Sequence, residues 1–190
     1  MGTPSRRERE RAERHQLIIT TARKLAATEG WDAVTTRRLS TEIEYSQPVL
    51  YSHFTDKHAI VAAVALEGFA ELATVLRAAR KDGAEPARAL LAVADAYLQF
   101  AESEPALYDA MFTLGVELPF GDPGELTPLS DAFAELVAVA EPLAGGQDVE
   151  LFTEVVWSSL HGLVTLTQNH RLRPDLTRAR RQLLVDRLVT

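Results

Sequence analysis

Apolar residues recur at three- and four-residue intervals through most of the chain, which is the spacing of one face of an α-helix. No segment shows the sustained alternation of apolar and polar residues that a half-buried strand requires. The pattern therefore predicts an all-α fold of about nine helices. They span about residues 9–28, two short segments between 35 and 54, and then 57–80, 86–104, 106–113, 129–140, 148–169 and 174–190.

Capping residues and breakers set the expected ends of these helices. Gly30 follows the first helix, where a C-terminal glycine is common, and Asp56 stands where it can cap the helix that starts at Lys57. Pro86 and Pro105 each open a helix, since a missing N–H costs little in the first turn. The segment 115–128 contains three prolines and three glycines, which predicts a loop.

Residues 35–57 contain two short helices joined by a tight turn. Thr35 or Thr36 can cap the first helix, which places Leu39 and Ile43 on one face. After the turn at Glu44 and Tyr45, the second helix carries mainly hydrogen-bonding side chains: Ser46, Gln47, Tyr51, Ser52 and His53. A short helix must be held by its neighbours, so one that is rich in polar groups is expected to face a polar partner. This arrangement is typical of a helix-turn-helix, whose second helix enters the DNA major groove.

The same stretch resembles the DNA-binding signature of the TetR (tetracycline-repressor-like) transcriptional regulators. The matching features are Gly30-Trp31-Asp32, a threonine cap, and Tyr51-Ser52-His53-Phe54-Thr55-Asp56-Lys57. The chain departs from the family at Ile43-Glu44, where Ala-Gly is usual, and at Pro48, where a small residue is usual. On this reading the residues at the DNA interface are Thr35, Arg37, Ser46, Gln47, Pro48, Tyr51, Ser52, His53 and Lys57.

Charge is distributed unevenly along the 190 residues, which are 46% hydrophobic, 25% charged and carry a net charge of −7. Residues 1–57 hold ten Lys/Arg and eight Asp/Glu, whereas residues 58–190 hold ten and nineteen. Attraction to phosphates is screened over about 10 Å, so a mildly basic N-terminal part can bind DNA despite the acidic remainder. The absence of cysteine excludes disulfides and thiolate metal sites.

No apolar run suggests a membrane span and the N-terminus lacks a secretory apolar core, so we expect a soluble cytoplasmic protein without a membrane partner. The sequence also lacks a glycine-rich phosphate loop, a Gly-x-Ser-x-Gly elbow and a His-Glu-x-x-His pair. We therefore expect no enzyme activity, no catalytic residues, no metal site and no cofactor.

The Trp157-x-x-x-His161-Gly162 pattern resembles the C-terminal domain of a TetR subgroup, in which this helix and the last one form the dimer surface. The residues expected there are Val155, Ser159, Gly162, Leu163, Leu166, Leu183 and Leu184. TetR-like C-terminal domains often enclose a small-molecule cavity, for which the candidates are Tyr97, Phe100, Tyr108, Met111, Phe112, Trp157 and His161. Ordinary core packing is the default interpretation of each aromatic residue, and for His161 we favour a buried histidine bonded to a neighbouring helix.

These observations predict a DNA-binding domain at residues 1–57 and a ligand-binding and dimerisation domain at residues 58–190. The resemblance implies a homodimeric repressor that binds a palindromic double-stranded operator and is released by a small-molecule effector. The alternative is an all-α protein-interaction module with a vestigial DNA-binding head. Salt-dependent binding to duplex DNA distinguishes the two.

Overall fold

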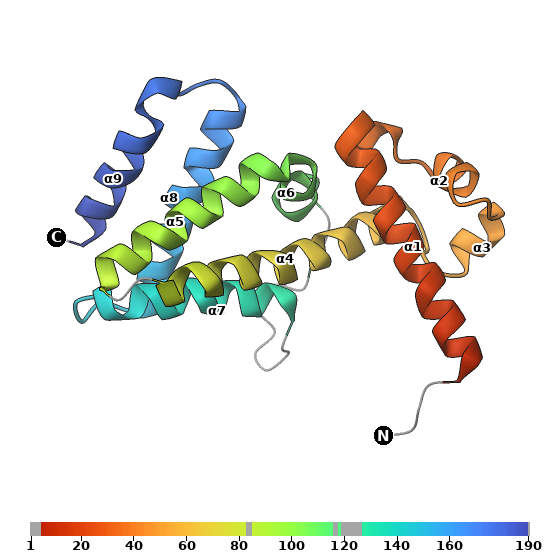
Figure 1. Ribbon diagram of the computed structural model, residues 1–190, viewed down its shortest axis with the longest axis horizontal. Helices are drawn as coiled ribbons and strands as arrows, with labels where there is room; N and C mark the ends of the chain where they lie inside the picture. Colours follow the sequence, from red (N-terminus) through yellow and green to blue (C-terminus); the bar gives the residue numbers. More distant parts are fainter. Residues whose placement is uncertain (1–4, 83–84, 116–117, 119–126, 190) are drawn as a thin grey trace. The chain divides into compact units, whose positions relative to one another are not determined.

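The computed structural model of the protein describes residues 5–82, 85–115, 118 and 127–189. Within these residues the chain forms nine α-helices, three short 3-10 helices and no strand, which confirms the predicted all-α fold (Figure 1). The α-helices are α1 (Arg6–Glu29), α2 (Thr36–Glu42), α3 (Gln47–Tyr51), α4 (Lys57–Asp82), α5 (Pro86–Ser103), α6 (Pro105–Phe112), α7 (Pro128–Ala140), α8 (Val149–Gln168) and α9 (Thr177–Leu188). The 3-10 helices are η1 (Trp31–Ala33), η2 (Glu141–Leu143) and η3 (Pro174–Leu176). Most of the loop predicted at 115–128 lies outside the described residues.

Helix ends follow local hydrogen bonds. Helix α1 begins three residues earlier than predicted because Ser5 and Glu8 form a capping box, in which the Ser5 Oγ accepts from the Glu8 N–H at 3.2 Å and the Glu8 carboxylate accepts from the Ser5 N–H at 2.6 Å. Its predicted end at Gly30 is confirmed, with φ at 83°. Asp56 accepts from the Ala59 N–H at 2.9 Å and so supports the start of α4, as predicted.

The chain divides into two compact units: residues 1–68 with 104–119, and residues 69–103 with 120–190. We call them unit 1 and unit 2. Helix α4 contributes residues to both, and α6 belongs to unit 1 although it follows α5 in the sequence. The predicted domains, residues 1–57 for DNA binding and residues 58–190 for ligand binding and dimerisation, are defined by function. The division into compact units does not test them, so they stay a prediction.

Unit 1 is organised around α1, which packs against α2, η1 and α6. Its core includes Ile18, Ala22, Val34 and Leu39, none of which is exposed to solvent. These side chains come from α1, the segment after η1, and α2, so the helix-turn-helix is fixed on α1 by apolar burial.

Helix α6 is tied into unit 1 at three points. The Trp31 indole N–H donates to the Ala106 carbonyl at 2.7 Å, and Arg23 pairs with Glu104 at 3.1 Å. Helix α4 approaches α6 so closely that a Cβ built at Gly68 would lie 2.6 Å from the sulfur of Met111 and 2.9 Å from Leu107 Cδ1. Only a glycine fits between α4 and α6 without displacing those side chains.

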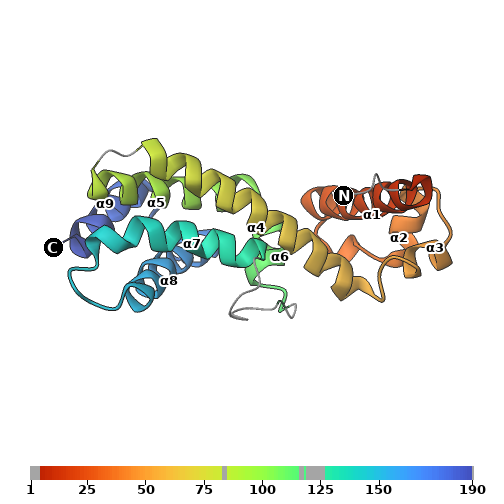
Figure 2. The same cartoon turned by 90° about the horizontal axis from the view of Figure 1, so that it is seen from below.

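In unit 2, helix α5 contacts α7, α8 and α9. Helices α7 and α8 also pack against each other (Figure 2). The core of unit 2 includes Leu90 and Val93 of α5, Leu136 of α7, and Leu160 of α8. The same unit contains a charged cluster. The Glu135 carboxylate on α7, in a residue that is 7% exposed, accepts from Arg77 at 2.7 Å and from Arg80 at 2.9 Å, both on α4.

Among the described residues, one helix is long and apolar enough to cross a membrane by length and composition alone. It comprises Lys57–Lys81 of α4, and half of its apolar window is buried inside the fold. Because α4 supplies core residues such as Val64 and Leu76, burial in a globular core accounts for its composition.

Candidate nucleic-acid interface

Helix α2 is fixed by a cap and by its apolar face. The Thr35 hydroxyl accepts from the Arg38 N–H at 3.1 Å, which satisfies one of the unpaired donors of the first turn. Leu39 is fully buried and Ile43 is 9% exposed. The predicted cap and apolar face are both confirmed, and together they hold α2 against α1.

The turn between α2 and α3 contains an unusual backbone conformation. Glu44 has φ at 57°, in the left-handed region that favours glycine. The chain reverses here with a hydrogen bond from the Tyr45 N–H to the Ser40 carbonyl at 3.1 Å. Glu44 is exposed and has no hydrogen-bond or ion-pair partner within the described residues. The turn therefore combines backbone strain with an unneutralised negative charge.

Helix α3 has five residues and is anchored through few side chains. Leu50 is 1% exposed and Phe54, just beyond the helix, is 7% exposed. Ser46 occupies the N-cap position, but its side chain accepts no capping hydrogen bond. The candidate contact residues Ser46, Gln47, Pro48, Tyr51 and Ser52 are all exposed, and Tyr51 is 52% exposed. The structure thus presents one polar surface on α3.

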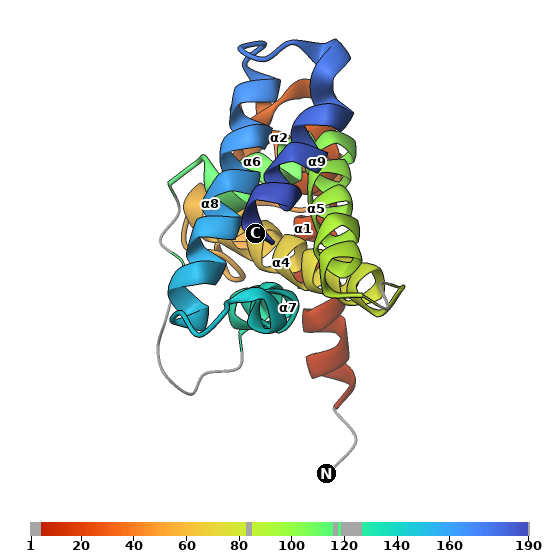
Figure 3. The same cartoon turned by 90° about the vertical axis from the view of Figure 1, so that its left-hand side faces the viewer.

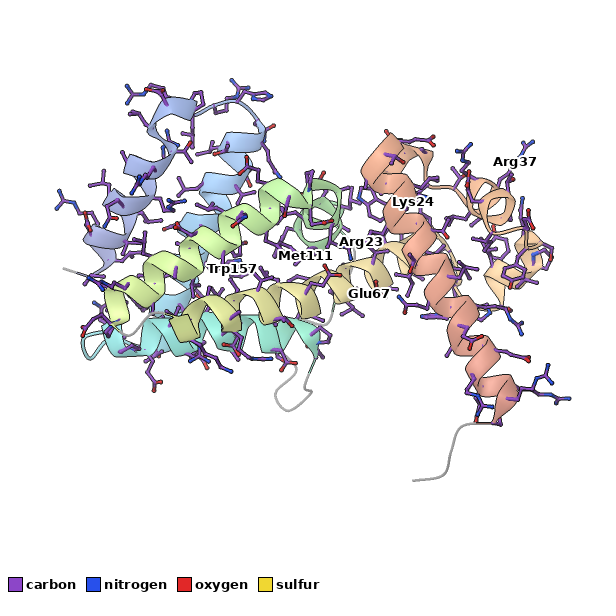
Figure 4. The ribbon with its side chains drawn as sticks, in the orientation of Figure 1. Arg23, Lys24, Arg37, Glu67, Met111 and Trp157 are labelled. Atoms are coloured by element: carbon purple, nitrogen blue, oxygen red, sulfur yellow. The ribbon has the colours of Figure 1, made fainter. Side chains whose placement is uncertain are left out.

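The candidate phosphate-binding cations have different surroundings. Arg37 on α2 is exposed, points away from the rest of unit 1, and makes no ion pair within the described residues (Figure 4). Lys57 is part-buried and donates to the Trp31 carbonyl at 2.6 Å. Arg37 is therefore available to a ligand, whereas Lys57 already holds η1 to the start of α4.

His53 lies beside a second histidine that sequence reasoning did not identify. The His53 ring lies 6.0 Å from the ring of His15, and the His15 ring stacks on Phe54 at 4.4 Å. The Nδ1 atom of His53 is buried without a hydrogen-bond partner in the described part of the chain. Burial lowers the pKa of His53, and the positive charges of Arg11, His15 and Arg14 lower it further. His53 is consequently kept neutral to lower pH than a free histidine.

The candidate pocket residues belong to both units. In unit 2, Tyr97 is fully buried and its hydroxyl accepts from the Trp157 indole N–H at 3.2 Å, while Phe133 meets the Trp157 ring edge-on at 6.3 Å. Phe100 is 6% exposed, and burial lowers the pKa of His161. In unit 1, Tyr108 and Met111 are buried and the Tyr108 ring lies 4.7 Å from Phe112. The structure thus joins Tyr97 to Trp157 within unit 2 and Tyr108 to Phe112 within unit 1.

The candidate dimer residues lie on α8 and α9. Val155, Leu166 and Leu183 are 50%, 44% and 56% exposed. Ser159, Gly162, Leu163 and Leu184 are half-buried. A Cβ at Gly162 would meet nothing within 4 Å, so packing within the protomer does not require a glycine at this position.

Sequence reasoning did not identify two structural features of unit 1. The hydrogen bond between Trp31 and Ala106 joins residues 75 apart in the sequence, and no local pattern indicates it. The second feature is the close contact at Gly68, which the apolar pattern of its helix does not indicate. A glycine in mid-helix costs up to about 1 kcal/mol relative to alanine, so its presence there is itself a signal of close packing.

Comparison with known proteins identifies the chain by sequence and by fold. Residues 18–64 match the family model described as bacterial regulatory proteins, tetR family, and residues 90–190 match the tetracyclin repressor-like C-terminal domain. An uncharacterized HTH-type transcriptional regulator, Rv0681 of Mycobacterium tuberculosis, is 32% identical over 143 residues. That match covers 73% of this chain and 62% of the relative, so the chain spans less than two thirds of that relative's length.

Solved structures share the fold. A protein of unknown function from Rhodococcus sp. RHA1 superposes with a TM-score of 0.73 at 21% identity, covering 93% of this chain and 95% of that one. The TetR family regulator PfmR of Thermus thermophilus gives a TM-score of 0.63 at 20% identity, covering 98% and 97%. Since a C-terminal family model covers more than half of the chain and an N-terminal one covers the helix-turn-helix, the protein belongs to the TetR family of bacterial regulatory proteins.

Proposed function

We propose that the protein is a homodimeric DNA-binding transcriptional repressor that leaves a palindromic operator when a small-molecule effector binds. The observation that carries this proposal is the exposed polar surface of α3, which the buried Leu50 anchors. Arg37 on α2, which makes no ion pair within the described residues, adds an available positive charge. Gln47 and Tyr51 would read base edges, with Ser46, Pro48, Ser52 and His53 around them. Thr35, Arg37 and Lys57 would contact phosphates.

Base readout by α3 is tested with Gln47→Ala. Gln47 is exposed at the start of α3, so its removal leaves the fold intact and should relax preference at one base pair, costing about 1–3 kcal/mol there. The measurement is binding to a randomised duplex library, followed by titration of the selected sequence and its point variants. Unchanged affinity and preference in Gln47→Ala would show that α3 does not read the bases.

Arg37→Ala is the matched control for phosphate contact. It should weaken binding to all sequences about equally and reduce the salt slope by about one ion. Lys57→Ala is less suitable, because it also removes the hydrogen bond to Trp31. A protein with no salt-dependent affinity for any duplex would instead support the alternative, an interaction module with a vestigial head.

Dimerisation is supported by the exposed apolar residues of α8 and α9 and by the open space at Gly162. Two-fold pairing would place two recognition helices about 34–36 Å apart, one turn of DNA, and would require a palindromic operator. Gly162→Leu should give a folded monomer in sedimentation. A wild-type chain that sediments as a monomer at micromolar concentration would contradict this part of the proposal.

The regulatory role would involve α6. This helix is held to unit 1 by Trp31, Arg23 and the close contact at Gly68, so an effector that displaced α6 would alter the support of the helix-turn-helix directly. The effector would need to bind the DNA-incompetent state more tightly than the competent one. Tyr97, Phe100, Tyr108, Met111, Phe112, Trp157 and His161 remain the candidate effector contacts. We expect no catalytic activity.

A further inference from the structure

Helix α3 is too short to fix its own orientation. It has five residues, and Ser46 at its N-cap position accepts no side-chain capping hydrogen bond. A helix of this length is held by its neighbours and not by its own propensity. Leu50 anchors its middle, so the contacts at its C-terminal end decide how the rest of the helix is oriented.

Helix α1 contacts that C-terminal end at two points. The Arg11 guanidinium donates from Nη2 to the Ser52 carbonyl at 3.3 Å. The His15 ring stacks on the Phe54 ring, with centroids 4.4 Å apart and planes inclined by 20°. Arg11 and His15 are four residues apart and therefore lie on one face of α1. Both contacts lie within unit 1.

Each contact supplies support that α3 cannot provide for itself. The last carbonyls of a helix have no N–H donor within the helix, and Arg11 provides a donor for the carbonyl of Ser52. Phe54 is joined to α3 because its N–H donates to the Leu50 carbonyl at 3.0 Å. Since Phe54 is only 7% exposed, the stacked His15 ring holds it in a fixed place.

We propose that Arg11 and His15 are positioning residues for base recognition, which fix the C-terminal end of α3 and so orient Gln47 and Tyr51 toward the bases. The inference rests on the proposed function, because it requires that α3 reads base edges. Recognition groups must be held to within about 0.5 Å of their productive geometry. Attraction to phosphates depends on charge and is independent of sequence. Loss of either positioning residue should therefore reduce specific binding selectively.

The test compares two duplexes of equal length: one that the wild type selects from a randomised library, and one of random sequence. His15→Ala and Arg11→Met should each reduce the ratio of the two affinities about three- to tenfold, because α3 must then be ordered when it binds. The affinity for the random duplex and its salt slope should stay at the wild-type values. A direct phosphate contact by Arg11 would instead weaken both duplexes equally and lower the slope by about one.

Conservative variants separate positioning from general damage. His15→Phe keeps a ring that can stack on Phe54, and Arg11→Lys keeps a hydrogen-bond donor, so both should restore most of the ratio. Arg7→Met is the matched control for the loss of a positive charge from α1. Figure 3 shows the first turns of α1 extending beyond the other helices of unit 1. Arg7 lies in these turns, is exposed and makes no ion pair within the described residues, so Arg7→Met should leave the ratio unchanged.

The measurement is fluorescence anisotropy with both labelled duplexes, from about 0.05 M to about 0.2 M salt. Circular dichroism and retained binding to the random duplex show that a variant is folded. If His15→Ala fails to fold, Arg11→Met decides the question, because Arg11 is exposed.

An unchanged ratio in the folded variants, beside a wild type that prefers its selected duplex, would overturn the positioning roles and leave the proposed function standing. Equal weakening on both duplexes would overturn them as well, and so would a loss that His15→Phe and Arg11→Lys fail to restore. A wild type that binds both duplexes equally would overturn the positioning roles together with the proposed base readout.

Discussion

Glu44 shows how one residue combines two unfavourable features at a candidate interface. Its φ of 57° is more costly for glutamate than for glycine, by about 1–2 kcal/mol, because Cβ approaches the following carbonyl. Its carboxylate is exposed beside the short helix that we propose to enter the groove, where it would repel phosphate. Both effects are properties of this residue alone, and two substitutions separate them.

Glu44→Gly should raise the free energy of unfolding by about 1 kcal/mol and strengthen DNA binding, because it removes both the strain and the charge. Glu44→Gln removes only the charge, so it should strengthen DNA binding without increasing stability. Urea unfolding and fluorescence anisotropy with labelled duplex provide the two measurements. Equal stabilisation by both variants would show that the conformation at residue 44 carries no strain.

At the scale of elements, α4 is held on its two halves by different forces. Close packing against α6 holds the half in unit 1, and ion pairs with α7 hold the half in unit 2. A single substitution removes or disturbs each of these contacts. The two substitutions should change the free energy of unfolding in different ways.

For the first half, Gly68→Ala should destabilise the protein by about 1–2 kcal/mol despite the better helix propensity of alanine, since its Cβ would overlap the Met111 sulfur. In a Met111→Ala background the same change should cost less, because the overlap with the sulfur is gone while Leu107 Cδ1 still lies 2.9 Å from the Cβ position. A double-mutant cycle in urea measures this coupling. Additive effects of the two substitutions would contradict the close contact.

For the second half, burial alone would raise the pKa of Glu135, but the hydrogen bonds from Arg77 and Arg80 outweigh burial and leave the pKa below its ordinary 4.5. The ionised form therefore stabilises the folded state above pH 4.5, and that contribution is lost as the pH falls through the lowered pKa. Glu135→Gln should cost about 1–2 kcal/mol at neutral pH, a modest figure because Arg77 is 46% exposed.

Thermal unfolding of wild type and Glu135→Gln across acidic pH checks this sign. The difference between them should shrink below pH 4.5 and disappear in strong acid. Glu102→Gln, at an exposed residue on α5, serves as the control with no expected effect. A difference that stays constant with pH would mean that Glu135 acts through packing and not through its charge.

At the scale of the whole molecule, the sequence predicted what local signals encode. The nine helices, the Thr35 cap and the end of α1 at Gly30 follow from periodicity and capping to within a few residues, over the part of the chain that the structure describes. The assignment of α6 to unit 1 could not be predicted in this way, because it depends on contacts such as Arg23 with Glu104, 81 residues apart. Helix α1 starts earlier than its apolar periodicity predicts because Ser5 and Glu8 form a capping box ahead of the first apolar residue.

The two tryptophans of the chain fall one in each unit, and both indole N–H groups are hydrogen-bonded. Trp31 donates to the first turn of α6, and Trp157 donates to Tyr97. The protein therefore carries two intrinsic optical probes, which Trp31→Phe and Trp157→Phe would isolate from each other. In the Trp157→Phe variant, release of α6 would expose the remaining indole, that of Trp31, to water and shift its fluorescence emission to longer wavelength. The Trp31→Phe variant would report only on the aromatic cluster around Trp157 in unit 2. Time-resolved fluorescence of the two unlabelled variants would therefore show which unit changes first.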